Sequence, residues 1–401
     1  MLKSERVGWD VSLGGLPSVE RVIRAGRGHD LHLGAQLFVS LAGDPVADVA
    51  IGEARPGSPL RTTDLMPWTC VSKPITSALV ANAWERGELD LDAPVAQHVP
   101  EFAAHGKHEI TLRHLLTHSS GLAGDPASLV FARPWPEVIK WVCNLKPLPR
   151  REPGRVFTYV RESAWFMLAE ILRRTLGIDD YPAYVRGRVF EALGMEDCWL
   201  AMPQERFRAY GNAIVPVQGM SGSGPMPYLC PQNDPFLAPR CSPGETGRGP
   251  MRELARFYES LLGLGGRPPL VDPETAREVT RPREVDRRQR VDWGLGFKAD
   301  RFSFRANHPL YPEQAFGHDG LDSFLALGDW RHDLVVTVAF NGQPRRAGAR
   351  GSPGLLRQQL FVAALYRDLG LSLFDEVGPA RIPYLDQRLE RFAATARAPQ
   401  G

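Results

Sequence analysis

Apolar runs separated by turns lie near both ends of the chain. Residues 36–41 read Gln-Leu-Phe-Val-Ser-Leu, a Gly-Asp-Pro turn follows, and residues 46–51 are again mostly apolar. Near the C-terminus, apolar runs at 322–327 and 334–340 flank a polar Gly-Asp-Trp-Arg-His-Asp turn. Such runs, bounded by turn residues, predict two strands joined by a turn at each place. The last run is apolar enough for a central strand of a sheet.

Helical periodicity occupies the middle of the chain. Ile75, Leu79, Val80 and Ala83 fall on one face of a helix that starts near residue 69 and stops at Gly87. Thr111 is a good N-cap residue for a following helix. Further helices are expected at 163–176, 181–193, 251–262 and 354–369.

Strands near both ends, with helices between them, predict an α/β fold in which a helical insertion splits a sheet. We expect a sheet domain formed by residues 1–66 and 290–401 and a mostly helical domain formed by residues 67–289, with approximate boundaries. Residues 201–249 are rich in glycine and proline and show little periodicity. We expect them to form a long irregular connection that lines a site.

Composition restricts the class of protein. The chain has 401 residues, 43% apolar and 23% charged, which is globular and argues against disorder, collagen and coiled coil. The net charge of +2 gives no electrostatic case for binding nucleic acid or an anionic membrane. No apolar run is long enough to span a membrane, and the N-terminus leads into no apolar signal segment. We therefore expect a soluble, cytoplasmic protein.

The five cysteines are an odd number and include no Cys-x-x-Cys pair. They therefore fit neither a disulfide framework nor a zinc site, and we expect free thiols and no metal. His114 and His118 do not form a His-Glu-x-x-His zinc motif either, and we expect them to pack in the core.

Cys70 and Lys73 have the most distinctive chemistry, and lysine is scarce here, with six among 48 basic residues. Residues three apart share a helix face, so the two side chains can touch. A helix N-terminus and a nearby ammonium both stabilise a thiolate, which activates a cysteine as a nucleophile. The alternative is that Cys70 is a small buried hydrophobic residue. Spacing alone does not decide, because Cys143 and Lys146 repeat it; however, prolines after Lys146 break any helix there.

Three motifs in order resemble those of the serine beta-lactamase and penicillin-binding-protein superfamily, in its class C beta-lactamase and esterase-like branch. Cys70-Val-Ser-Lys73 stands at the Ser-x-x-Lys motif, with cysteine in place of the nucleophilic serine. Tyr159-Val-Arg161 aligns with the second motif of the superfamily, Tyr-x-Asn. His318-Asp-Gly320 aligns with the third motif, which is Lys-Thr-Gly or His-x-Gly. Secondary landmarks at 87–95, 115–122, 190–195 and 293–297, and the final hairpin ending at Asn341, extend the resemblance over roughly residues 30–370.

The resemblance implies a beta-lactamase-like α/β fold, with an antiparallel sheet flanked by helices plus a mostly helical region, and a site in the cleft between them. It implies that Cys70 attacks an acyl carbonyl while Lys73 and Tyr159 hold and shuttle its proton. The oxyanion would lie between the backbone N–H groups of Cys70 and Leu321, and His318 would face the leaving group or a substrate carboxylate. No cofactor is implied.

Four further residues are candidates for binding substrate. Arg161 replaces an amide of the family motif and is able to bind an anion bidentately. Asp319 either reaches the substrate or caps a turn, and Gly320 follows it in the same motif. Trp293 is a candidate pocket aromatic, like Tyr228 and Trp330, although a core position is the usual place for such residues.

The replacement of serine by cysteine favours acyl transfer, because a thioester reacts with amines in preference to water more strongly than an oxygen ester does. We therefore expect an acyltransferase that passes an acyl group from a small ester or amide to an amine or alcohol. We expect its place to be ATP-independent amide or ester formation in natural-product biosynthesis, including that of antibiotics. One alternative is a hydrolase: a carboxylesterase, an amidase or a beta-lactamase-like enzyme. A second alternative is a non-catalytic ligand-binding homologue. The sequence is compatible with a natural cysteine and with an engineered one, and it predicts no oligomeric state.

Overall fold

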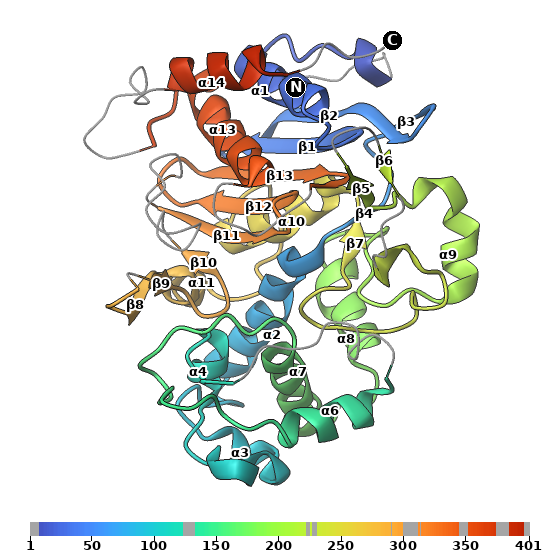
Figure 1. Cartoon of the computed structure of the whole chain (residues 1–401). Coiled ribbons are helices and arrows are strands. Elements are labelled where there is room, and N and C mark those ends of the chain that lie inside the picture. The colour runs from blue at the N-terminus through green and yellow to red at the C-terminus, as the bar shows by residue number, and fades with distance from the viewer. Residues whose placement is uncertain are drawn as a thin grey trace.

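A nine-stranded sheet joins the two ends of the chain, and every strand pairing in it is antiparallel (Figure 1). The computed structural model describes residues 8–122, 133–221, 225–226, 231–289, 291–299, 312, 314–344, 352–373 and 385–396. The strands, in their order across the sheet, are β3 (Ser58–Pro59), β2 (Asp44–Arg55), β1 (Gly34–Leu41), β13 (Leu334–Phe340), β12 (Phe324–Asp329), β11 (Ala315–Gly320), β10 (Lys298–Ala299), β9 (Val291–Trp293) and β8 (Arg283–Asp286).

Inside the sheet, β1 pairs with β13, and Leu37 lies opposite Val338. All residues of β13 are buried, because both faces of the sheet are covered. Val336 and Val338 face a core shared with the terminal helices, whereas Val335 and Ala339 face the core of the helical region. Both strand pairs predicted from the apolar runs, and their position in a split sheet, are confirmed.

Helices cover both faces of the sheet. One face packs against α1 (Pro17–Gly28), α13 (Pro353–Asp368) and α14 (Leu385–Ala394), which lie together at the top of Figure 1. The other face packs against α10 (Met251–Leu262). The sequence analysis predicted α10 and α13 but not α1 or α14.

The helical region lies below the sheet in Figure 1 and surrounds α2 (Lys73–Glu85). Every residue of α2 from Lys73 to Ala83 is buried, as expected of a helix with neighbours on all sides. The α7 helix (Ser163–Leu176) packs against it and ends at Gly177, whose φ of 65° suits glycine. The remaining helices here are α3 (Val95–His98), α4 (Leu112–Leu116), α6 (Trp135–Cys143), α8 (Tyr181–Val185), α9 (Gln204–Tyr210) and α11 (Pro273–Thr280).

Short turns and strands complete the chain. The helix predicted at 181–193 is α8 followed by a π-helical turn, and the connection predicted as irregular at 201–249 contains α9 and short strands. The 3-10 and π turns are η1 (Gly8–Asp10), η2 (Thr69–Ser72), η3 (Pro100–Gly106), η4 (Arg186–Glu191), η5 (Gly211–Ala213) and η6 (Pro231–Asn233). The minor strands are β4 (Met66–Pro67), β5 (Gln218–Met220), β6 (Pro225–Met226), β7 (Arg248–Gly249) and β14 (Gly342–Pro344).

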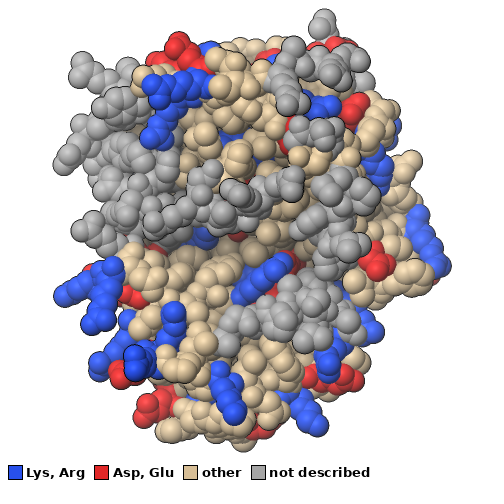
Figure 2. Space-filling view, in the orientation of Figure 1, with Lys and Arg blue, Asp and Glu red and all other residues tan. Residues whose placement is uncertain are grey.

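The division of the chain at residues 66 and 290 stays a prediction. Strands β8 and β9 stand on either side of residue 290 in one sheet, and α10 packs on that sheet although it lies between residues 67 and 289. Basic and acidic side chains are scattered over both the sheet and the helical region on the face shown in Figure 2. None of the helices in the described ranges is both long and apolar enough to cross a lipid bilayer.

Candidate active site

Cys70 lies in the 3-10 turn η2, which leads directly into α2. The helix predicted from residue 69 therefore begins with a tighter turn than an α-helix. Cys70 is 7% exposed, whereas Lys73, three residues on, is fully buried. Thr69 has a φ of 50°, a sparsely populated conformation for a β-branched residue. Local backbone strain of this kind is often found where a side chain is held for a reaction.

The side chain of Lys73 extends beneath Tyr159. Its Nζ donates a hydrogen bond to the carbonyl oxygen of Gly244 at 2.9 Å. The same atom lies 5.7 Å from the ring centre of Tyr159 and 5.2 Å from that of Trp165. It is also 4.0 Å from a carboxylate oxygen of Glu162. Lys73 is thus close to both a tyrosine and a buried carboxyl group.

The hydroxyl of Tyr159 is hydrogen bonded to the thiol of Cys70. Tyr159 is 37% exposed overall, but its hydroxyl end meets the buried thiol. Burial, and then the proximity of Cys70, raises the pKa of Tyr159 well above its usual range. Near neutral pH, Tyr159 is therefore a protonated hydroxyl that touches the thiol.

His118 holds the segment around Tyr159 in place. Its carbonyl oxygen accepts from the N–H of Thr158 at 2.8 Å, and its Nδ1 accepts from the N–H of Val160 at 3.0 Å. The rings of His118 and Tyr159 lie 4.4 Å apart. His118 is fully buried, and burial lowers its pKa well below the usual range. The structure thus gives His118 a packing position beside the site. His114 is the N3 residue of the capping box formed by Thr111, the cap predicted for α4.

His318 lies on β11 with its ring 6.3 Å from that of Tyr159. Its Nδ1 lies 2.7 Å from the carbonyl oxygen of Asp319, and because a carbonyl only accepts, Nδ1 carries the proton. Burial, with Lys298 and Lys73 nearby, lowers the pKa of His318 well below the usual range. The imidazole is therefore neutral, and it offers a lone pair on Nε2 rather than a positive charge for a carboxylate. Within the described ranges no group hydrogen bonds to this Nε2.

The end of β11 packs against η2. A Cβ atom added to Gly320 would lie 3.2 Å from the backbone nitrogen of Cys70 and would overlap the hydroxyl of Thr69. Leu321 follows Gly320 immediately, with a φ of 51° that turns the chain toward β12. The two segments that supply the predicted oxyanion donors are therefore neighbours, and their role in binding an oxyanion stays a prediction.

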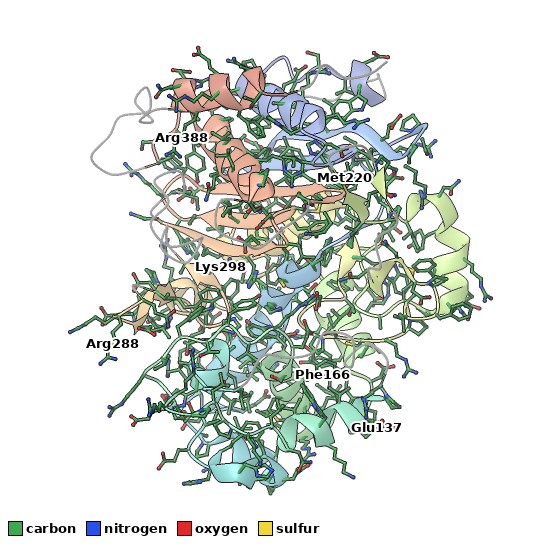
Figure 3. All side chains as sticks on the ribbon, viewed as in Figure 1. Glu137, Phe166, Met220, Arg288, Lys298 and Arg388 are labelled. Atoms are coloured by element: carbon green, nitrogen blue, oxygen red, sulfur yellow. The ribbon has the colours of Figure 1, made fainter. Side chains whose placement is uncertain are left out.

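The charged candidates for substrate binding already have partners. Arg161 forms an ion pair with Glu245, although a third of its side chain remains exposed. Asp319 is buried and forms an ion pair with Lys298, which lies at the edge of the sheet nearest the helical region (Figure 3). Trp293 is buried, and its ring lies 5.0 Å from that of His118 and 6.1 Å from that of His318. Substrate binding by Arg161, Asp319, Gly320 and Trp293 stays a prediction.

Three charged residues of the site were missed by sequence reasoning: Glu162, Glu245 and Lys298. Glu162 follows the second motif directly, and Glu245 lies in the connection that was predicted to line a site. Lys298 is one of the six lysines, and the scarcity of lysine is the signal that pointed to Lys73. Their meeting in space depends on long-range contacts, which no local pattern contains.

The other thiols of the described residues lie in environments that disfavour a thiolate, whereas Cys230 lies outside those residues. Burial raises the pKa of Cys143 to about 11, and burial also raises the pKa of Cys198 and of Cys241. Cys143 is the last residue of α6, and its carbonyl oxygen accepts a hydrogen bond from Lys107. The second Cys-x-x-Lys pair therefore differs from the first in its surroundings, as the prolines after Lys146 predicted.

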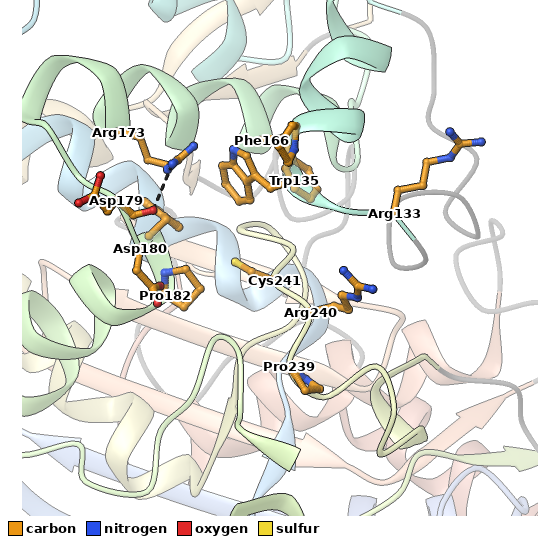
Figure 4. A pocket seen from close by; sticks show the side chains of 12 residues that line it. Arg133, Trp135, Phe166, Arg173, Asp179, Asp180, Pro182, Pro239, Arg240 and Cys241 are labelled. Carbon is orange, nitrogen blue, oxygen red and sulfur yellow. Dashed lines mark hydrogen bonds between the residues drawn. The ribbon is translucent and has the colours of Figure 1, made fainter. Parts of the chain in front are cut away.

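Other residues singled out in the sequence lie away from this site. The indole of Trp330 donates to Thr280 and stacks on Phe316, so Trp330 is partly buried and packs against the core. Tyr228 lies outside the described residues. A cavity of about 320 Å³ on the helical region has Cys241 in its wall, with Trp135, Phe166 and Arg240 (Figure 4).

The comparisons with known proteins agree with the fold. Residues 19–360 match the family model described as Beta-lactamase, which covers most of the chain. The chain belongs to the beta-lactamase family. The resemblance predicted from the three motifs is confirmed at this level, and so is the predicted α/β fold. Solved structures that share this fold include a family VIII carboxylesterase and a D-stereospecific amidohydrolase from Streptomyces sp..

Two curated relatives match part of the chain. Esterase/beta-lactamase LipL of Mycobacterium tuberculosis is 38% identical over 93 residues, which are 23% of this chain and 22% of LipL. Esterase EstB of Burkholderia gladioli is 32% identical over 176 residues, which are 39% of this chain and 44% of EstB. The chain thus matches less than half the length of either relative.

Solved structures match nearly the whole chain. A penicillin-binding protein homolog from Caulobacter crescentus has a TM-score of 0.71 at 22% identity, covering 89% of this chain and 98% of that one. EstCE1, described as a hydrolase with promiscuous acyltransferase activity, has a TM-score of 0.70 at 18% identity, and the match covers 87% of this chain and 99% of EstCE1. Simvastatin synthase LovD from Aspergillus terreus has a TM-score of 0.68 at 19% identity and covers 88% and 95%. At such identities the likeness shows the fold.

Proposed function

We propose that this beta-lactamase-family protein is an acyltransferase that carries its acyl group on Cys70 as a thioester. The observation that supports this most directly is the hydrogen bond between the Cys70 thiol and the Tyr159 hydroxyl, above the buried Lys73. A thiol that touches a proton-transferring group, beside a cation, has the surroundings of an activated nucleophile.

In the first half of the reaction, the sulfur of Cys70 attacks the carbonyl carbon of a small ester or amide. The thiol proton passes to the oxygen of Tyr159 while the hydroxyl proton of Tyr159 passes to the leaving alcohol or amine. The C–S bond forms and the bond to the leaving group breaks, so protons and electrons balance. Lys73 stabilises negative charge on the phenol oxygen, and the N–H groups of Cys70 and Leu321 stabilise the oxyanion.

In the second half, an amine or alcohol attacks the thioester and regenerates the thiol. The Nε2 lone pair of His318 suits this step, because it is able to accept a hydrogen bond from the N–H or O–H of the incoming group. A thioester prefers amines to water, which favours transfer over hydrolysis. The descriptions of EstCE1 and LovD support transfer on this fold. A place in ATP-independent amide or ester formation in natural-product biosynthesis is part of this proposal.

The second candidate function is ester hydrolysis. The names of LipL and EstB favour it. It uses the same acyl-enzyme, with water as the acceptor, so the fate of the thioester separates the two functions.

The test is intact-mass spectrometry of the protein after exposure to p-nitrophenyl acetate. We expect one acetyl adduct on Cys70, none in Cys70→Ala, and an amide as the main product when a millimolar amine is added. Cys70→Ser is the matched control, because its oxygen ester should pass more of the acyl group to water. Dominant hydrolysis in the native protein at millimolar amine would establish the esterase instead. Full activity of Cys70→Ala would overturn the nucleophile, and the absence of any adduct or turnover would favour a binding protein.

A further inference from the structure

We propose that Glu162 and Glu245 share one proton in a buried pair that positions Lys73, and that loss of this proton at alkaline pH slows the acylation of Cys70. The inference rests on the proposed function, since it concerns the same acylation step. It assigns a role to two residues that belong to none of the three motifs.

The two carboxyl groups are buried and bonded to each other. Glu162, directly before α7, is 0% exposed, and Glu245 is 2% exposed. The hydroxyl of Ser242 donates to Glu162, and the two carboxyl groups are hydrogen bonded. Ionised carboxylates only accept hydrogen bonds, so a bond between two of them requires a proton. Two neighbouring like charges are also costly in a buried place.

The groups around Glu162 favour one charge for the pair. The charges of Lys73 on α2 and of Glu245 on the neighbouring loop affect the pKa of Glu162. The charge of Glu162 in turn raises the pKa of Tyr159 and Arg161, on its own segment, and of Cys241, on that loop. Burial, and then the charge of Glu245, raises the pKa of Glu162 well above its usual range. Although burial opposes it, the hydrogen bond from Glu162 and the charge of Arg161 hold the pKa of Glu245 below its usual range. The two pKa values thus shift in opposite directions, so the shared proton belongs on Glu162, and Arg161 balances the charge of Glu245.

The pair is connected to Lys73 in two ways. Glu162 lies 4.0 Å from Nζ of Lys73, and the carbonyl that accepts from this Nζ belongs to Gly244, next to Glu245. When the shared proton is lost, the pair carries two negative charges and attracts the ammonium form of Lys73 toward Glu162. Nζ of Lys73 also lies 5.7 Å from the ring centre of Tyr159. A stronger attraction to Glu162 thus competes with the contact between Lys73 and the group that exchanges a proton with Cys70.

The experiment measures the rate constant for acylation of Cys70 by p-nitrophenyl acetate as a function of pH. The native protein should lose rate about tenfold per pH unit above the pKa of the pair. Glu162→Gln lacks the shared proton, so its acylation rate constant should not fall in this pH range. Any decrease that remains should occur at higher pH and come from other groups. Glu245→Gln removes the like charge, so the fall should move to lower pH by about one pH unit or more. Glu259→Gln is the matched control: Glu259 is buried and accepts from Ser40 and Arg267, away from Lys73.

If the pair had only a structural role, the two variants would acylate more slowly by the same factor at every pH, and the rate would still decrease at the same alkaline pH. That result would overturn the proposal. A second measurement needs no reaction. Infrared difference spectra at neutral pH should show a protonated-carboxyl band that Glu162→Gln loses and Glu259→Gln keeps. If Glu162→Gln loses the band but the native protein forms no adduct, the pair is retained and the proposed function is rejected. If the native protein forms the adduct but Glu162→Gln keeps the band, the proposed function is retained and the pair is rejected. If Glu162→Gln does not fold, the Glu245→Gln pH profile decides.

Discussion

Tyr159 is the residue at which the described groups of the site meet. Its hydroxyl touches Cys70, Lys73 lies beneath its ring, and the ring of His118 lies against it. Because His118 binds the backbone on both sides of Tyr159, the ring has little freedom to leave this position. A motif of weak specificity in the sequence thus corresponds in the structure to a hydroxyl held against the Cys70 thiol.

Replacing Tyr159 by phenylalanine removes the hydroxyl and keeps the ring. We expect the rate of acylation of Cys70 to fall about 10²-fold or more, the usual size of an acid–base contribution, with little change in melting temperature. Single-turnover acylation and thermal unfolding measure the two effects. Tyr258→Phe is the control, because it removes a tyrosine hydroxyl from a fully buried position on α10. Equal rates in the two variants would contradict a role of the Tyr159 hydroxyl in proton transfer.

At the scale of elements, the contact of β11 with η2 determines the shape of the site. The strand brings His318 and Gly320 to the turn that carries Cys70. Gly320 permits this close approach, because any side chain there would meet Thr69 and the backbone nitrogen of Cys70.

Gly320→Ala should therefore push η2 away from β11. We expect acylation to slow at least about tenfold, because a small displacement of the reacting groups is costly. Gly14→Ala is the control, since a Cβ there meets no atom within 4 Å and the backbone needs no positive φ. Kinetics of adduct formation in the two variants give the comparison. Unchanged kinetics in Gly320→Ala would show that the contact does not constrain the nucleophile.

At the scale of the whole molecule, buried polar side chains connect the N-terminal and C-terminal segments of the sheet. Asn341 is fully buried, and its side-chain oxygen accepts from the N–H groups of Leu33 and Gly34. Its amide donates to the carbonyls of Glu53 and Ala54. One residue at the end of β13 thus satisfies four backbone groups of the first hairpin, which lies about 300 residues earlier in the chain.

Asn341→Ala leaves these backbone groups buried and unsatisfied. We expect the free energy of unfolding to fall by at least about 4 kcal/mol, measured by urea denaturation, since each of the four unsatisfied groups costs about 1–3 kcal/mol. Asn144→Ala removes an exposed asparagine at the end of α6 and should cost less than about 0.5 kcal/mol. A similar loss in both variants would rule out this role for Asn341.

Local sequence determined the elements whose signals lie within a few residues. The hydrophobic spacing and the following glycines of α7 and α10 predicted both helices with their observed bounds. Turn residues between apolar runs predicted both hairpins, and three short motifs in order predicted the family. These features are local because helix caps and tight turns are stabilised by contacts between near neighbours.

Tertiary structure decided what depends on distant segments meeting. The placement of β1 beside β13 comes from pairing between strands that are far apart in the sequence, such as that of Ala35 with Phe340. His318 is neutral because burial lowers its pKa. The pKa of Glu162 is raised by burial and by the charge of Glu245, which is 83 residues further along the chain. The sequence therefore determined which residues carry reactive groups. Only the folded chain decided their charges and partners, because desolvation and electrostatic interaction act through space rather than along the backbone.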